Sequence, residues 1–491
     1  MEYVLLLFIT PLLAIISLSI SNHVVYGKIQ AVFSVVMFFA AVAMAYTVVS
    51  TGAPIVFWDQ AVYVDGLSAL NVLLISLVGA LAAIYSKDYM ETEFKEKLIT
   101  KGQLRFYYLF FYLFIISMFV ASVVNNLGLL WVGIELTTLI SALLVAFYGK
   151  QYALEAAWKY LIMGSVGISF ALLGIIFIYI SSLSIEGHQI FALQWTELCK
   201  VASQLDPHWF KIGFVLVLIG FGTKAGLAPM HFWLPDAHSQ APSPISAVLS
   251  GVLLNTALYG LFRVYTIANM TITTGVAEYL IIFGLISVAV TVPFITVQSD
   301  LKRMLAYSSV EHMGIITLGI GIGGPIGIYG ALLHMFNHSL TKSLLFFSAG
   351  VICHHYHTKQ MQRITGLLKT MPIIGGIFLL SAFAIAGSPP FSIFMSELMI
   401  LIAGFKAGYL VVTILFAVLI VLIFAGMMYY IVRMVFGTAS TRIEKIKFSP
   451  WIAFSLFVPL TFVILCGFHV PNFLNELISA ASSVIQQGVV K

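Results

Sequence analysis

The chain has 491 residues, of which 61% are hydrophobic and 9% are charged, and its mean hydropathy is +1.04. Because a soluble domain usually carries about 25% charged residues, this composition excludes a soluble globular protein and indicates a polytopic membrane protein. The formal net charge is +5. Three cysteines without paired spacing indicate neither a disulfide framework nor a cysteine-based metal site.

Apolar segments long enough to cross a bilayer recur along the whole chain. A spanning helix needs about 20 mostly apolar residues, so the sequence predicts an all-α fold with about 14 spans. The predicted spans cover approximately residues 3–20, 29–50, 66–85, 106–123, 126–148, 156–181, 211–232, 243–267, 276–297, 303–321, 325–351, 372–402, 409–436 and 450–470.

The basic residues are distributed unevenly between the two ends of these spans. About two thirds of the Lys and Arg residues fall in loops after odd-numbered spans, Arg442, Lys445 and Lys447 among them. Cytoplasmic loops carry an excess of such residues. The pattern therefore predicts that both termini lie outside the cytoplasm.

The seventh predicted span contains the stretch FGTKAGLAPMHFWLPDAHSQAPSP, residues 221–244. Proline removes a backbone donor and clashes with the preceding helical turn, so we expect Pro229 and Pro235 to break this helix. Broken backbone at membrane depth is tolerated only against protein or internal water. The stretch thus predicts a polar pocket beside the buried Lys224.

A second interruption occurs at AGSPPFSIFMSEL, residues 386–398, where Pro389 and Pro390 precede Glu397. Two broken spans in corresponding positions are typical of transporters built from structural repeats. We therefore expect two inverted five-helix repeats with broken helices 7 and 12.

The predicted organisation follows from the spans and their breaks. Its four parts are an N-terminal helical segment with a cytoplasmic loop at 1–105, repeats at 106–267 and 276–436, and a last span with a short C-terminal segment at 437–491.

Charged residues inside spans are costly and usually mark ion pathways. Glu135 lies among apolar residues, and a nearby cation would keep its carboxylate charged; Lys224 is the obvious candidate. A purely structural ion pair is the alternative.

The stretch HMFNHSLTKSLLF places His334, His338 and Lys342 at successive four-residue intervals, on one face of a helix. Imidazoles exchange protons near neutral pH, and a lysine between low-dielectric walls can also do so. This face predicts a ladder of proton carriers. No metal site is expected, because no third ligand with convincing spacing lies nearby in sequence.

Weaker candidates could belong to the relay or support it. Glu155 and Lys159 equally suit an ordinary salt bridge at a helix end, and CHHYH at 353–357 is a weak zinc pattern. The supporting candidates are Glu155, Lys159, His231, His238, Asn255, Glu311 and His312.

Motifs for other chemistry are absent from the sequence. We find no phosphate-binding lysine loop, dinucleotide-binding glycine motif, paired Cys-x-x-Cys or nucleophile elbow, and nothing that indicates nucleic-acid binding. No cofactor is therefore expected in this chain.

The sequence resembles a known family, the proton-conducting antiporter-like membrane subunits shared by respiratory complex I, Mrp sodium/proton antiporters and group 4 membrane-bound [NiFe] hydrogenases. The motifs that carry the resemblance are WVGIELTTL, KAGLAPMHFWLPDAHSQAPSPISAVLSG, DLKRMLAYSSVEHMG, HMFNHSLTKSLLF and GSPPFSIFMSEL. Within the family, EAAWKYLIMGSVGIS and SGVLLNTALYG are most similar to the F-type subunit of hydrogenase-4 and formate hydrogenlyase-like complexes.

The resemblance implies residue roles. Glu135 would pair with Lys224, the ladder at His334 would belong to a hydrated relay, and Glu397 would be its terminal group. One position departs from the pattern: Asn255 stands where related complex I subunits have a lysine, and an amide can hold water but cannot carry the charge.

These observations favour a proton-translocating subunit of a redox-driven respiratory complex, with a group 4 hydrogenase implied by the resemblance. Expected partners are other antiporter-like and membrane-anchor subunits, peripheral redox subunits that carry [NiFe] and iron–sulfur clusters, and the lipid of a prokaryotic cytoplasmic membrane. Protons, or alternatively sodium, are the expected ions. The alternatives are a Mrp-type sodium/proton antiporter subunit, a subunit that energises inorganic-carbon uptake, and a purely structural membrane arm.

Overall fold

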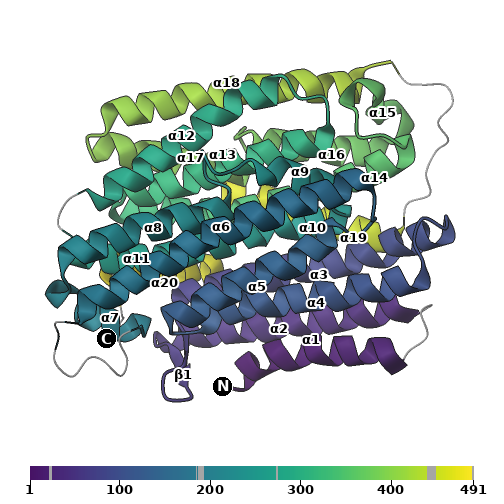
Figure 1. Ribbon diagram of the computed structural model, residues 1–491. Helices are drawn as coiled ribbons and strands as arrows, with labels where there is room; N and C mark the ends of the chain where they lie inside the picture. Colours follow the sequence, from purple (N-terminus) through teal and green to yellow (C-terminus); the bar gives the residue numbers. More distant parts are fainter. Residues whose placement is uncertain (21–24, 184, 186–192, 273–274, 439–448, 489–491) are drawn as a thin grey trace.

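The structure is a computed structural model that describes residues 1–20, 25–183, 185, 193–272, 275–438 and 449–488. Long helices lie side by side, with the N-terminal α1–α4 along one side of the bundle and α18 along the other (Figure 1). The helices are α1 (Glu2–Ile20), α2 (Tyr26–Thr51), α3 (Gly66–Lys95), α4 (Lys101–Val123), α5 (Leu127–Val145), α6 (Gln151–Ser182), α7 (Trp195–Lys200), α8 (Pro207–Ala225), α9 (Trp233–Gln240), α10 (Ser243–Val248), α11 (Leu254–Thr271), α12 (Val276–Thr296), α13 (Leu301–Ile322), α14 (Gly324–Tyr356), α15 (Leu367–Thr370), α16 (Pro372–Ile385), α17 (Ser392–Lys406), α18 (Leu410–Phe436), α19 (Pro450–Phe468) and α20 (Asn472–Gln487).

The centre of the bundle is formed by α3, by α13 and by the helix from α10 to α11. In the most apolar window of each, every residue is buried, whereas only 22% of the corresponding window of α18 is buried. Polar side chains on the central helices therefore face protein, which is where charged groups at membrane depth are tolerated. The apolar outer face of α18 suits lipid or a neighbouring subunit.

The helical character predicted from sequence is confirmed, with one addition among the described residues. Strands β1 (Ile55–Phe57) and β2 (Val62–Val64) form a short antiparallel hairpin between α2 and α3. The predicted boundary at residue 105 falls inside α4, because this helix already begins at Lys101.

Among the described residues, 11 helices are long and apolar enough to cross a membrane. The predicted spans 211–232, 325–351 and 372–402 do not qualify as single apolar helices. The first two carry Lys224 and the His334 ladder, whose polar residues lower the hydropathy. The third is divided by the second break into α16 and α17, which have 14 and 15 residues and are too short to qualify. The total of about 14 spans stays a prediction.

The first break lies between α8 and α9. α8 ends one residue before Gly226, whose φ of +78° is a left-handed cap that favours glycine. Pro229 lies in the irregular stretch that follows, as predicted. Pro235 as a break was wrong: it lies in the first turn of α9, where its missing N–H would have no helical partner.

The second break separates α16 from α17, and both Pro389 and Pro390 lie in it, as predicted. Each break falls in the fourth span of one predicted repeat. The repeat relationship itself stays a prediction.

The C-terminal helix α20 packs against the start of α3. A Cβ atom added at Gly66 would lie 2.7 Å from the Ala480 backbone, so the two helices approach closely. The C-terminal segment is therefore held against its own chain. Arg442, Lys445 and Lys447, which enter the charge count, lie outside the described residues.

Candidate functional site

Lys224 lies in the last turn of α8 and is fully buried. Its Nζ donates hydrogen bonds to Thr138 Oγ1 on α5, at 2.7 Å, and to the Tyr160 hydroxyl on α6, at 2.5 Å. A cation near a helix C-terminus is stabilised by the last backbone carbonyls. The break therefore places an ammonium group at a buried helix end, bonded to neutral hydroxyls.

Glu135 faces α6 from α5. Its Oε1 accepts a hydrogen bond from Ser165 Oγ at 2.9 Å, and its buried Oε2 has no protein partner. The direct pairing with Lys224 that the resemblance implies is not found among the described side chains, since the ammonium bonds Thr138 and Tyr160 instead. Thr138 follows Glu135 by three residues on α5, so the two groups line the same face.

An aromatic contact joins the first break to α6. The Trp233 ring stacks on Tyr160, with ring centroids 4.5 Å apart, and Trp233 Nε1 donates to the Thr223 carbonyl at 2.9 Å. Tyr160 also shares a 2.7 Å hydrogen bond with Ser141 Oγ. These contacts hold α9 beside the Lys224 site.

His238 on α9 points from this region toward α14. Its Nδ1 donates to the Leu234 carbonyl at 2.8 Å, which leaves Nε2 as the nitrogen with a lone pair, buried and without a protein partner. The ring lies 5.8 Å from Phe346 of α14, four residues after Lys342. His238, one of the supporting candidates, therefore lies on α9 beside α14, the helix that carries the ladder.

The ladder on α14 faces α13. Lys342 is fully buried and its Nζ donates to the Leu305 carbonyl, at 2.8 Å, and to Ser308 Oγ. The His338 ring lies 5.3 Å from His312 of α13, and neither His338 nitrogen has a protein partner. The structure therefore adds His312 to the ladder.

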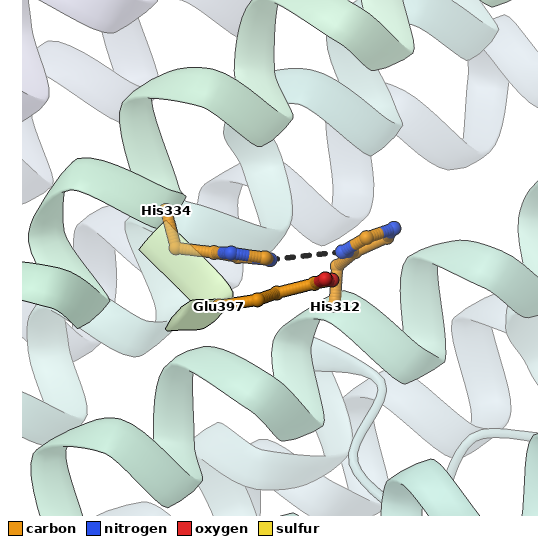
Figure 2. A group of neighbouring side chains, drawn as sticks. All are labelled: His312, His334 and Glu397. Carbon is orange, nitrogen blue, oxygen red and sulfur yellow. Dashed lines mark hydrogen bonds between the residues drawn. The ribbon is translucent and has the colours of Figure 1, made fainter. Parts of the chain in front are cut away.

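The two helices meet α17 at a cluster of three titratable side chains. His312 Nδ1 and His334 Nε2 are 2.8 Å apart, and Glu397 points toward both (Figure 2). His334 Nδ1 lies 3.0 Å from Ser396 Oγ. The predicted ladder and the predicted terminal group therefore lie within 4.8 Å of each other, and His312, predicted only as a supporting residue, bonds the first histidine of the ladder.

Gly387 leaves room for this carboxylate at the second break. A Cβ atom at this position would lie 2.1 Å from Glu397 Oε2, and the φ of Gly387 is +70°. Both observations favour glycine here. The break thus brings backbone directly against the terminal carboxylate.

Asn255 contributes packing near the ladder. Its Nδ2 donates to Ser339 Oγ and to the Gly251 carbonyl, each at 2.8 Å, while the buried Oδ1 has no protein partner. It follows a π-helical turn at Leu249–Leu253, a feature frequent at functional sites. Asn255 is thus available to hold water without carrying charge.

Two supporting candidates lie on the surface. Lys159 bonds Glu155 at 2.6 Å and reaches Asp236 at 3.4 Å, and Asp236 also pairs with Arg303 at 3.0 Å. Because Lys159 and Glu155 are about half exposed, this network is the ordinary salt bridge that the sequence left open.

His231 lies away from the ladder. Its ring is 6.1 Å from Phe294 and 6.3 Å from Tyr307, between α12 and α13. Glu311, adjacent to His312 on α13, is buried, and its Oε2 has no protein partner.

The buried ion pair between Arg263 and Asp65 was not predicted from the sequence. Arg263 on α11 forms a two-pronged contact with Asp65, at 2.6 and 2.7 Å, and Asp65 caps the start of α3. Asp65 stands directly before an apolar run and Arg263 inside a predicted span, which is the signal that could have revealed them. Thr138, Tyr160 and Ser396 had no such signal, because neutral hydroxyls are common in membrane helices.

Several buried polar atoms at the site lack protein partners. In the described part of the chain they include Glu135 Oε2, His238 Nε2, Asn255 Oδ1, Glu311 Oε2, His312 Nε2 and both nitrogens of His338. Buried polar atoms are normally hydrogen-bonded, and water supplies the missing partner where protein does not. The arrangement therefore fits a hydrated path.

A cavity of about 320 Å³ opens at the end of the bundle where α9, α13 and α14 meet. Among its lining residues, Lys302 donates to the Ala241 carbonyl at 2.8 Å and Tyr148 donates to Glu93 Oε1 at 2.9 Å. Burial lowers the pKa of Lys359, in the loop after α14, despite the nearby carboxylate of Asp300. Gln240 and Ala241, at the end of α9, also line the cavity, two and three residues after His238.

The chain is similar to known membrane proteins over most of its length. The profile of the family described as NADH:quinone oxidoreductase/Mrp antiporter, TM matches residues 124–423, and that of the complex I chain 5 N-terminus matches residues 58–107. A hydrogenase-4 component F homolog of Methylacidiphilum infernorum (isolate V4) is 38% identical over 414 residues, which cover 83% of this chain and 85% of the relative.

Solved structures share the fold. A chain of the membrane-bound sulfane sulfur reductase, an archaeal respiratory membrane complex, matches with a TM-score of 0.87 at 24% identity, covering 99% of this chain and 98% of that one. A chain of the Mrp complex from Dietzia sp. DQ12-45-1b matches with a TM-score of 0.86 at 20% identity, covering 99% of both chains. The chain therefore belongs to the NADH:quinone oxidoreductase/Mrp antiporter family of membrane proteins.

Proposed function

We propose that the chain is a proton-translocating, antiporter-like subunit of a redox-driven membrane complex. The observation that carries this proposal is a row of buried titratable groups that runs from His338 to Glu397. The ring centroids of His338 and His312 are 5.3 Å apart, His312 and His334 share a 2.8 Å hydrogen bond, and Glu397 lies within 4.8 Å of both imidazoles. Their unpartnered atoms leave places for water to complete the row.

The proposed proton path begins at the cavity lined by Gln240 and Ala241 at the end of α9. A proton passes by water from this cavity to the region between Lys224 and Lys342, where His238 offers its free Nε2. It then moves along His338 and His312 to the second break. Because Glu135 bonds Ser165 and not Lys224, its carboxylate tunes the field at the first break without neutralising the ammonium by contact.

The final step uses the cluster at α17. His312 and His334 share one hydrogen bond, so a proton arriving at one imidazole can be passed to the other and from there to Glu397. Release follows beside the Gly387 backbone, where the helix is broken.

A partner must supply the energy. Moving one charge against 100 mV costs about 2.3 kcal/mol, and the sequence has no recognisable redox cofactor motif. Similarity to a hydrogenase-4 component supports a hydrogenase as the partner. The proposed assembly has further antiporter-like and membrane-anchor subunits, with peripheral subunits that carry [NiFe] and iron–sulfur clusters. The proposed location is a prokaryotic cytoplasmic membrane, with both termini outside the cytoplasm.

The test is proton pumping by vesicles that contain the intact complex, followed with pH-sensitive and potential-sensitive dyes. Lys224→Ala should lower pumping while assembly and electron transfer persist. Lys211→Ala is the matched control, since Lys211 lies at the other end of the same helix, over the Tyr279 ring.

Unchanged pumping in Lys224→Ala, with assembly intact, would refute a relay centred on the first break. Loss of pumping only when sodium is withdrawn would instead identify sodium as the coupled ion.

A further inference from the structure

The cluster at the second break has the donor set of a metal site. His312, His334 and Glu397 come from α13, α14 and α17, all three are buried, and their ligand atoms lie within 4.8 Å of one another. Two imidazoles and one carboxylate form a donor set that zinc accepts, with a fourth position left for water. The third ligand is distant in sequence, which is why local spacing gave no sign of it.

The hydrogen bonds around His334 direct a lone pair into the cluster. Ser396 Oγ donates to the Ile393 carbonyl at 2.8 Å, so the same oxygen accepts the proton of His334 Nδ1, which is 3.0 Å away. His334 Nε2 is then the unprotonated nitrogen. A metal-binding histidine commonly has its other nitrogen held in this way.

His312 is the donor in the hydrogen bond between the two imidazoles. Because His334 Nε2 is an acceptor, His312 Nδ1 carries the hydrogen of the 2.8 Å bond between them, and its Nε2 is buried without a protein partner. That free nitrogen can take the proton when Nδ1 gives it up.

We propose that His312, His334 and Glu397 bind a divalent transition-metal ion of the zinc class in place of the proton that the two imidazoles share. Zinc–nitrogen bonds of about 2.0–2.1 Å in tetrahedral geometry separate two ligand nitrogens by about 3.3 Å. The imidazoles must therefore move apart by about 0.5 Å from their hydrogen-bonded distance. The His312 proton moves from Nδ1 to Nε2. Glu397 binds the ion as a carboxylate, so a proton held on this side chain leaves to water when the ion binds.

The bound ion acts as an inhibitor of the proposed proton path, because it occupies the nitrogens through which the proton passes. It reaches the cluster at the second break, where the Glu397 carboxylate lies against Gly387 and where Pro389 and Pro390 are exposed. Binding does not depend on the proposed function, since the same three ligands bind the ion whether or not the chain conducts protons.

The experiment measures zinc binding to the purified, metal-stripped intact complex by equilibrium dialysis with radioactive Zn²⁺, together with zinc K-edge absorption. Wild type should bind one more zinc ion per copy of this chain than Glu397→Gln. The difference spectrum should show nitrogen and oxygen ligands at about 2.0–2.1 Å. His354→Gln, in the histidine tract at the end of α14, is the control and should retain the ion.

A second variant covers the case in which Glu397→Gln does not assemble. Ser396 is a positioning residue, and Ser396→Ala should weaken zinc binding by about 10–100-fold, as expected when the support of a ligand is removed. Equal binding by wild type and both variants would overturn the proposal. So would loss of the ion only in His354→Gln, which would mean adventitious binding at the surface tract.

Discussion

The two helix breaks hold opposite kinds of group. At the first, Lys224 sits at the C-terminal end of α8 and bonds only neutral hydroxyls, of Thr138 and Tyr160. At the second, Glu397 lies beside two imidazoles that bond each other. A broken helix exposes backbone groups that favour a cation at one kind of end and an anion at the other.

This difference suggests a division of labour between the breaks. The Lys224 ammonium bonds only neutral hydroxyls, which are poor proton acceptors, so water is the main group to which it can release its proton. The first break therefore suits holding a charge. The second break brings several proton acceptors within 4.8 Å of one another, so it suits transfer. The hydroxyl partners at the first break and the imidazoles at the second are therefore the features to change.

Among changes to residues of the two breaks themselves, the largest effect is expected from Glu397→Gln, which keeps the shape of the side chain but cannot release a proton. Pumping should fall by more than about tenfold, which corresponds to about 1.4 kcal/mol in a barrier. It is measured as protons moved per electron in vesicles. Glu278→Gln, at the exposed start of α12, is the control and should pump normally. Normal pumping by Glu397→Gln would remove the carboxylate from the path.

A smaller effect is expected from Gly387→Ala. The left-handed backbone costs a non-glycine residue about 1–3 kcal/mol, and the new methyl group must push the Glu397 carboxylate away. Thermal unfolding of the purified complex should begin at lower temperature and pumping should decrease. Gly376→Ala is the control, since a Cβ there meets no atom within 4 Å. Equal behaviour of the two variants would show that the close approach has no role.

The smallest effect is expected from Tyr160→Phe, which tests whether the hydroxyl at the first break carries a proton or only supports Lys224. The hydrogen bond from Lys224, worth about 1.5–3 kcal/mol, and the neutral hydrogen bond with Ser141 are both lost, while the Thr138 bond and the Trp233 contact remain. Pumping should fall less than in Lys224→Ala. Tyr152→Phe, on the exposed side of α6, should match wild type. Complete loss of pumping in Tyr160→Phe would make the hydroxyl a proton carrier and not a support.

Local features of the sequence predicted much of this architecture. Apolar length located the helices, and proline located the breaks at Pro229 and Pro389, because both effects act within one or two turns. Pro235 misled, since proline at the start of a helix looks the same in sequence as proline that ends one. Its position relative to α9 decides between the two.

The contacts of the site required the packed fold. His312 meets His334 and Glu397 only because α13, α14 and α17 converge, and no local spacing encodes that arrangement. Similarly, the sequence predicts that Lys224 meets the carboxylate of Glu135, but Lys224 bonds the hydroxyls of Thr138, on the same helix as Glu135, and of Tyr160 on α6. The sequence showed which buried positions carry acidic or basic groups, but it did not show which groups these side chains contact.

The most direct test of a single path between the breaks is to interrupt it at His312. His312→Phe keeps a ring in the same place and removes both nitrogens, so pumping by the intact complex in vesicles should be lost while assembly and electron transfer continue. His208→Phe, at the exposed start of α8, is the matched control. Pumping by His312→Phe at the wild-type number of protons per electron would contradict the proposed path.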